Sequence, residues 1–159
     1  MAHGMVTLTE TTKEELSIFF EFQLDKEAAH LAAFTPKDTK DKTAYIARYT
    51  TYLADPAIHM RTIKVDGIIV GSIAKFVLGD KAGITYWIDR KCWGQGIATA
   101  ALADFLKMEQ TRPIHAEVAF DNYGSQKVLE KCGFVRTGTD KGFANARQAE
   151  IEEVLYKLS

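Results

Sequence analysis

The sequence predicts an α+β fold in which helices flank a mixed, mostly antiparallel sheet of about seven strands. Apolar residues occur at helical spacing in the first third of the chain, and the pattern then changes to the two-residue alternation of strands. Three consecutive strands form a meander, and a strand–helix–strand unit follows them. The composition, with 47% hydrophobic and 26% charged residues, is that of an ordinary globular protein with a core.

Length and composition exclude several classes of protein. The 159 residues fit one domain over residues 1–159. With 20 Lys and Arg against 21 Asp and Glu, the chain lacks the basic excess of a general nucleic-acid binder. No apolar run approaches the roughly 18–20 residues of a membrane helix, and the first residues do not resemble a secretory signal. We therefore expect a cytoplasmic protein with no nucleic-acid or membrane partner, with Cys92 and Cys132 reduced and no metal site.

The first part of the chain predicts one strand and three helices. Thr12 followed by Glu15 matches a capping box at the start of the first helix. Asp55-Pro56 ends the third helix, because a residue before proline avoids the helical conformation. The expected elements are a strand at 6–9 and helices at 12–22, 25–34 and 39–53.

The remaining chain contains the meander and the strand–helix–strand unit. Asp66-Gly67 predicts a two-residue hairpin turn, and Gly133 is typical of the residue that follows a helix. The expected elements are strands at 58–65, 68–78 and 82–89, a helix after residue 96, a strand at 114–120, a helix at 122–132, and strands at 134–139 and 149–158.

The segment from Ile88 to Thr99 has the most informative pattern. A strand runs into a loop with Gly94 and Gly96, and a helix begins directly afterwards. Such a loop lets backbone N–H groups point in one direction, and a helix N-terminus adds unpaired N–H groups and a positive dipole end. This combination favours a pyrophosphate site, but a tight strand–helix connection without a ligand has the same pattern. A Walker loop is excluded because no Gly-Lys pair occurs, and a dinucleotide-binding GxGxxG pattern fits poorly.

The loop resembles the acyl-coenzyme A loop of the GNAT N-acetyltransferase superfamily. The family pattern is Gln or Arg, two residues, Gly, one residue, and then Gly or Ala; Trp93, Gly96 and Ala98 occupy these positions here. The Trp-Gly pair resembles the branch of ribosomal-protein N-terminal (alanine) acetyltransferases. Because Trp93 replaces a polar side chain, we expect backbone amides to make most of the pyrophosphate contact.

A second segment, residues 121–134, is similar to another signature of this family. Asn122 and Ser125 match its Asn-x-x-Ser/Ala start, and the following helix ends in Lys-x-Gly-Phe. Two motifs in the right order are more specific than either alone. The resemblance runs from about residue 58 to the C-terminus, and the first 55 residues match only in the order of their helices.

The resemblance implies a GNAT fold with acetyl-coenzyme A as co-substrate in a cleft between two diverging strands. The pantetheine arm would pair with the end of the third meander strand like an added strand. The pyrophosphate would lie over the loop amides, and Asn122 would contact the arm. The cofactor-binding residues implied in this way are Trp87, Ile88, Asp89, Trp93, Gly94, Gln95, Gly96, Ile97, Ala98, Thr99, Asn122 and Ser125.

The implied reaction is N-acetylation of a primary amine, on a protein N-terminus or a small molecule, by direct attack on the thioester. The amine must be neutral, the oxyanion needs N–H donors, and the leaving thiolate benefits from an acid. Many family members supply a tyrosine as this acid, but Leu129 occupies its position here. The similarity to the N-terminal acetyltransferase branch implies Ser125 in its place.

The sequence offers several candidates for the general base. They are Glu117, His115, Tyr86 and Glu21, and a chain of water molecules could replace all four. Each side chain also has a structural explanation, as a satisfied sheet histidine, a solvent-facing carboxylate or a core aromatic.

Other residues concern the acceptor and the phosphates. In this family the first helices cover the acceptor cleft, so Phe34 and Glu21 are expected to line it. The remaining charged candidates could equally be surface charges: Lys91 and Arg112 for phosphates, and Glu150, Glu152 and Glu153 for a cationic acceptor.

Two alternatives fit the same motifs. One is a module that senses acyl-coenzyme A without turnover, because the tyrosine is absent at position 129. The other is a transferase for a longer acyl group. Dimers occur in the family, so the resemblance also allows a homodimer.

Overall fold

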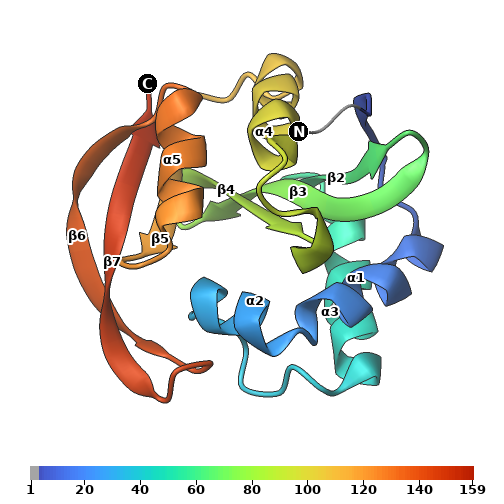
Figure 1. Cartoon of the computed structure of the whole chain (residues 1–159), viewed down its shortest axis with the longest axis horizontal. Helices are drawn as coiled ribbons and strands as arrows, with labels where there is room; N and C mark the ends of the chain where they lie inside the picture. Colours follow the sequence, from blue (N-terminus) through green and yellow to red (C-terminus); the bar gives the residue numbers. More distant parts are fainter. Residues whose placement is uncertain (1–3) are drawn as a thin grey trace.

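Strands and helices follow one another in the predicted order (Figure 1). The computed structural model describes residues 4–159. The strands are β1 (Val6–Glu10), β2 (His59–Val65), β3 (Ile68–Leu78), β4 (Lys81–Ile88), β5 (Ile114–Ala119), β6 (Val135–Ala144) and β7 (Ala149–Leu158). The helices are α1 (Leu16–Gln23), α2 (Lys26–Ala32), α3 (Lys42–Ala54), α4 (Ile97–Met108) and α5 (Tyr123–Lys131), with short 3-10 turns η1 (Lys13–Glu15) and η2 (Arg90–Cys92).

Among the boundaries that differ from the prediction, two have clear local reasons. α3 begins slightly later than expected, because the Asp41 carboxylate accepts a hydrogen bond from the Ala44 N–H at 3.0 Å and caps the helix there. β6 is longer than expected and reaches Ala144, because its pairing with β7 continues as far as Ala149. The hairpin formed by β6 and β7 therefore extends well past the ends of the neighbouring strands.

All seven strands form one sheet in the order β1-β2-β3-β4-β5-β7-β6. β4 and β5 are parallel neighbours, and the other neighbouring pairs are antiparallel. The parallel pair is the strand–helix–strand unit, in which α4 connects the two strands. The predicted mixed, mostly antiparallel sheet is thus confirmed.

Helices cover both faces of this sheet. α4 and α5 lie on one side, and α1, α2 and α3 lie on the other (Figure 1). The larger core cluster contains Phe105 of α4, Leu129 of α5 and Tyr156 of β7, which are all almost fully buried. A smaller cluster contains Leu16 and Met60 under α1 and α3. Because the two groups of helices pack on opposite faces, the ends of β4 and β5 lie between them.

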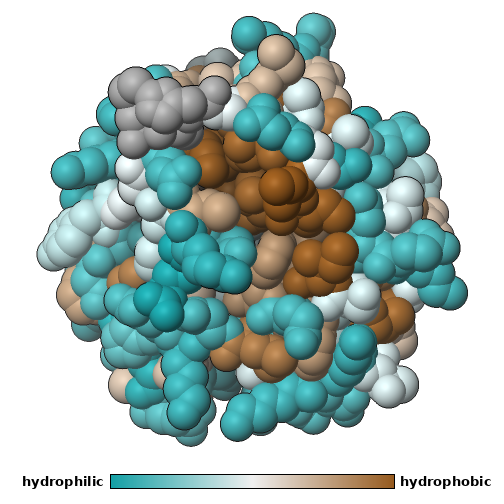
Figure 2. Space-filling model, turned by 45° about the vertical axis from the view of Figure 1, so that its right-hand side comes forward, coloured by the Kyte–Doolittle hydropathy of each residue, from teal (hydrophilic) through white to brown (hydrophobic). Residues whose placement is uncertain are grey.

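One face of the surface has a clear apolar area among hydrophilic side chains, and Figure 2 shows this area near the middle of that face. Among the described residues, no helix is both long and apolar enough to span a membrane. Residues 4–159 also contain no group of three or more His, Cys, Asp and Glu side chains arranged to hold a metal ion.

Candidate active site

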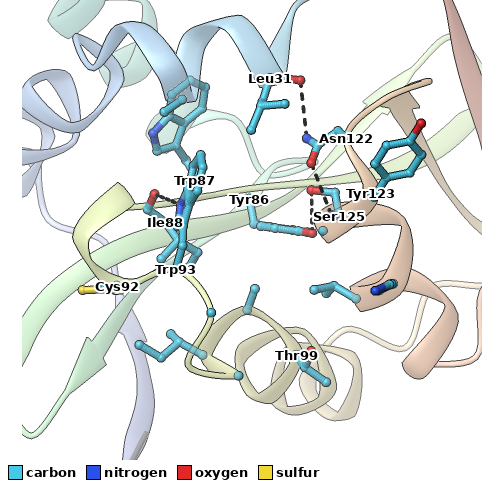
Figure 3. Close-up of a pocket in the computed structure, with 18 of the residues that line it drawn as sticks. Leu31, Tyr86, Trp87, Ile88, Cys92, Trp93, Thr99, Asn122, Tyr123 and Ser125 are labelled. Carbon is cyan, nitrogen blue, oxygen red and sulfur yellow. Dashed lines mark hydrogen bonds between the residues drawn. The ribbon is translucent and has the colours of Figure 1, made fainter. Parts of the chain in front are cut away.

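β4 and β5 separate soon after they meet. Their pairing covers Ala82 and Gly83 of β4, whereas β4 continues to Ile88 and β5 to Ala119. A cavity of about 670 Å³ opens beside the diverging strands, which is large enough for a substantial ligand (Figure 3). It is lined by residues from α2, β4, α4, α5 and the loop before α4: Ala28, Leu31, Ala32, Tyr86, Trp87, Ile88, Cys92, Trp93, Gly94, Gly96, Ile97, Ala98, Thr99, Asp121, Asn122, Tyr123, Gly124, Ser125, Lys127, Val128 and Lys131.

The loop between β4 and α4 presents its backbone to this cavity. Gly94 and Gly96 have φ values of 75° and 77°, a left-handed conformation that other residues rarely adopt. A Cβ atom added to either glycine would meet nothing within 4 Å, so open space lies in front of both. Gly96 also precedes α4 and offers no side-chain cap. The N–H groups of the first turn of α4 are therefore available to a ligand.

This end of the cavity is suited to an anion. The dipole of α4 places partial positive charge at its first turn, beside the free N–H groups. Lys127 and Lys131 of α5 also line the cavity and add full positive charges. A pyrophosphate fits this combination of donors, charge and open space.

One side-chain and one backbone hydrogen bond hold the loop beside the ends of β3 and β4. The Trp93 Nε1–H donates to the Ile88 carbonyl at 3.0 Å, and the Asp89 N–H donates to the Val70 carbonyl at 2.8 Å. Trp93 therefore braces the loop with its one polar atom. Contact with an anion is left to the backbone, in line with the expectation from the sequence.

The first turn of α5 forms the facing wall. The Asn122 side chain accepts from the Ser125 N–H at 3.3 Å and caps the helix. Its amide nitrogen donates to the Leu31 carbonyl of α2 at 3.4 Å. Asn122 thus connects α5 to α2 at the end of the cavity remote from the glycine loop (Figure 3).

Two hydroxyl groups meet across the cavity. Tyr86 of β4 donates a hydrogen bond to Ser125 Oγ of α5 at 3.0 Å (Figure 3). Burial raises the pKa of the Tyr86 hydroxyl to about 12, against a smaller lowering by Ser125. Tyr86 therefore keeps its proton at neutral pH, which argues against the predicted alternative that it is the base.

Comparison with known proteins identifies the family. The family model of an acetyltransferase (GNAT) domain matches residues 6–135. The chain belongs to the GNAT acetyltransferase family. Enzymes of this family use acetyl-coenzyme A as co-substrate, so the predicted fold, enzyme class and donor are confirmed. A search of curated proteins finds no match.

Solved structures of other acetyltransferases share the fold of this GNAT domain. RimJ of Mycobacterium smegmatis in complex with CoA-disulfide is 24% identical, with a TM-score of 0.80 over 99% of this chain and 83% of that chain. The microcin C7 self-immunity acetyltransferase MccE in complex with acetyl-CoA and AMP is 16% identical, with a TM-score of 0.80 over 96% and 91% of the two chains. The ribosomal-protein-S5-alanine acetyltransferase of Vibrio fischeri is 18% identical, with a TM-score of 0.77 over 96% and 92%.

The lysines of the GNAT cavity differ from those considered in the sequence. Lys127 and Lys131 were missed, although their spacing of four residues places them on one face of α5. Arg112 lies beyond the opposite end of α4, where it donates to the Glu109 carbonyl at 2.8 Å. The suggestion that Arg112 contacts phosphates is therefore wrong. Lys91 does not line the cavity either.

The predicted base candidates on β5 do not line the cavity. Side chains alternate along a strand, and residues 114, 116 and 118 face the core beneath α4 and α5. Glu117 and His115 consequently project from the other face of the sheet. Glu117 is exposed, and His115 is half-buried.

Glu117 lies against a second carboxyl group that the sequence did not link to it. Burial and the neighbouring charge of Glu117 raise the pKa of Glu153 on β7 to about 7, with a smaller contribution from Asp140 on β6. The Glu153 carboxyl group therefore holds its proton to a higher pH than an ordinary glutamate does. The acidic run at 150–153 is thus divided between the two faces of β7.

The two predicted acceptor residues lie outside the cavity as well. Phe34 follows a tight turn in which its N–H donates to the Ala32 carbonyl at 2.7 Å, and Ala33 has a φ of 65°. Its ring lies over Gly142 of β6, where an added Cβ would be 3.3 Å from it. Glu21 is exposed on α1. Phe34 therefore lies against β6 just after the end of α2, and Glu21 lies on the outside of the helical layer.

α2 is held at both of its ends by arginines. Arg90 donates to Asp25 at 2.8 Å and pairs with Glu27 at 3.1 Å, at the end of α2 that faces the glycine loop. At the other end, Arg147 donates to the His30 carbonyl at 2.8 Å and makes two hydrogen bonds of 2.7 Å with Asp121. α2 is thus held beside the opening between β4 and β5, where Ala28, Leu31 and Ala32 line the cavity.

Proposed function

We propose that this GNAT enzyme transfers the acetyl group of acetyl-coenzyme A to a primary amine by direct attack. The observation that carries the proposal is one cavity with an anion-binding helix end at one side and the Ser125 hydroxyl at the other. The two features lie on α4 and α5, which face each other across the space left by β4 and β5.

The backbone of residues 94–99 would hold the pyrophosphate, with support from Lys127 and Lys131. β4 beyond Gly83 has no strand partner on the side of β5, so its backbone can pair with the amide groups of the pantetheine arm. Asn122 lies at the end of this path, beside Ser125. The arrangement brings the thioester to the hydroxyl group.

Acyl transfer changes the protonation of two atoms, the acceptor nitrogen and the leaving sulfur. The acceptor nitrogen forms a bond to the carbonyl carbon, and the carbon–sulfur bond breaks with its electron pair on sulfur. The nitrogen loses one proton, and the sulfur gains one. Ser125, which lines the cavity, would donate its hydrogen bond to the leaving sulfur. Backbone N–H groups of β4, beyond the point where it diverges from β5, would stabilise the oxyanion.

Glu117 remains our proposed base, acting together with Glu153. Because the pKa of Glu153 is raised to about 7, this carboxyl can take up a proton near neutral pH once it has lost its own. The pair faces the side of the sheet opposite α4 and α5, so an acceptor would approach from that side. Phe34 would border its path.

The acceptor class is best narrowed by a direct screen. We suggest a protein N-terminus first, because the Trp93-Gly94 pair resembles the ribosomal-protein branch and RimJ shares the fold. The chain would be incubated with acetyl-coenzyme A and a panel of peptides, amino acids and polyamines, with released thiol as the signal. We expect thiol release with at least one acceptor.

The matched variants are Ser125→Ala and Ser17→Ala, since Ser17 is a serine on α1 outside the cavity. Ser125→Ala should slow release about 100-fold with unchanged affinity for acetyl-coenzyme A, and Ser17→Ala should leave both unchanged. Tight binding without thiol release across the whole panel would favour a sensor. Faster turnover of a longer acyl donor in the same assay would show that the enzyme is a transferase for a longer acyl group.

A further inference from the structure

The Ser125 hydroxyl already receives one hydrogen bond from the protein. Tyr86 donates to Ser125 Oγ at 3.0 Å, so the Ser125 proton cannot point toward Tyr86 at the same time. Among residues 4–159, no side chain or carbonyl accepts that Ser125 proton. The proton is therefore available to a ligand in the cavity that both residues line.

Both partners are fixed by the elements that carry them. Tyr86 is paired with Ile73 in the register of β3 and β4, and its ring packs against the main core. Ser125 is fixed in the first turn of α5 by the cap that Asn122 provides. The hydrogen bond thus bridges β4 and α5 on either side of the cleft.

We infer that Tyr86 is a positioning residue that turns the Ser125 hydroxyl into a hydrogen-bond donor toward the leaving sulfur. The inference rests on the proposed function of Ser125. As the carbon–sulfur bond breaks and its electron pair moves to sulfur, the Ser125 O–H points at the developing negative charge. Tyr86 stays protonated throughout, and the proton that sulfur finally holds balances the one lost by the amine nitrogen.

The protonation state of Tyr86 supports this role over that of a base. An α-amino group becomes largely neutral above its pKa of about 8, and a lysine-type amine only above about 10.4. In the upper part of this range an ordinary tyrosine would lose its proton, but burial raises the pKa of Tyr86 to about 12. The donor is consequently retained at the pH values where the acceptor is most reactive.

A double-mutant cycle tests the inference. Single-turnover rates with saturating acetyl-coenzyme A would be measured for the wild type, Tyr86→Phe, Ser125→Ala and the double variant. Tyr156→Phe serves as the matched control, because it also removes a tyrosine hydroxyl that donates to α5, to Glu130 at 2.7 Å, away from the cavity. Thermal unfolding and affinity for coenzyme A would be recorded for each variant.

We expect Tyr86→Phe to lower the single-turnover rate about fivefold, the equivalent of one hydrogen bond, with little change in affinity for coenzyme A. In the Ser125→Ala background the same substitution should have no further effect, because the group it positions is gone. Tyr156→Phe should lower the stability and leave the single-turnover rate unchanged.

Three results would overturn the inference in distinguishable ways. Equal slowing by Tyr86→Phe with and without Ser125 would show that Tyr86 acts independently of Ser125. A wild-type rate for Tyr86→Phe combined with a slow Ser125→Ala would reject the positioning role and leave the proposed function intact. A wild-type rate for Ser125→Ala would reject the acid itself, and the inference with it.

Discussion

The two walls of the cavity are built in different ways. The wall formed by the β4–α4 loop presents backbone amides, and its geometry depends on Gly94 and Gly96 within one short segment. The wall formed by α2 is held by side chains distant in sequence, among them Arg90 with Asp25 and Arg147 with Asp121. The first wall can be recognised from a motif, whereas the second exists only once the chain has folded.

The difference has a physical origin. Backbone N–H groups at a helix start are present whatever the side chains, provided that the preceding loop leaves them open. Ion pairs between distant segments depend on the exact approach of those segments. We therefore expect substitutions in the loop to affect ligand affinity. Substitutions in the two ion pairs of Arg90 and Arg147 should affect stability and the position of α2.

The largest effect is expected at Gly96. Gly96→Val places a branched side chain at a φ of 77° and in the open space before α4. Affinity for coenzyme A should fall about 100-fold, because the strain and the blocked amides act together. Isothermal titration calorimetry measures this loss directly.

The control for Gly96 is Gly79→Val in the turn between β3 and β4. Gly79 also has a positive φ, of 65°, and open space around its Cβ position. It should lose stability to a similar degree but bind coenzyme A normally. An equal loss of affinity in both variants would mean that the loop acts only through general stability.

The second-largest effect concerns Arg90 and Arg147, the two arginines that hold the ends of α2. Only 9% of the Arg147 side chain is exposed, whereas 48% of the Arg90 side chain is exposed. Arg147→Ala leaves a carboxylate and a carbonyl without their partner, so we expect a loss of about 2 kcal/mol in the free energy of unfolding. Arg90→Ala should lose less than about 1 kcal/mol. Urea denaturation of both variants tests this order, and a reversed order would contradict this account of the two arginines.

The smallest effect concerns the carboxyl pair behind the sheet. The pKa of Glu153 is raised from 4.5 to about 7, so the folded protein binds a proton that the unfolded chain releases between these values. The raised pKa of Glu153 therefore lowers the free energy of unfolding as the pH rises from about 4.5 through about 7. Glu153→Gln should be more stable than the wild type at pH 8 by less than about 1 kcal/mol, because solvent screens the pair.

At pH 5 this advantage should shrink, since protonated Glu153 and glutamine are both neutral. Denaturation curves at the two pH values provide the measurement. A variant advantage that is the same at both values would mean that Glu117 and Glu153 do not interact in the folded protein.

The sequence predicted the parts of the molecule that local rules determine. The order of the elements and the loop around Gly96 follow from hydrophobic periodicity and from motifs within a few residues, and the two diverging strands were implied by the resemblance to the family. Lys127 and Lys131 could have been found from the spacing of four residues along α5, but nothing local indicated that this face points at the cavity.

The contacts that the sequence did not predict join residues that lie far apart along the chain. Glu117 meets Glu153 because β5 and β7 are neighbours, and Arg147 reaches Asp121 because the β6–β7 hairpin bends back to α5. The position of Phe34 depends likewise on a tight turn at Ala33 that its apolar neighbours do not suggest. Such contacts are consequences of topology, which spacing alone cannot specify.

One titration tests most directly whether the backbone amides of residues 94–99 hold the pyrophosphate. Coenzyme A and pantetheine, which has the same arm but no pyrophosphate, would be titrated into the wild type and into Gly96→Val. We predict that the wild type binds coenzyme A far more tightly than pantetheine, and that Gly96→Val removes most of this difference while binding pantetheine almost normally. Equal affinity of the wild type for the two ligands would contradict the account.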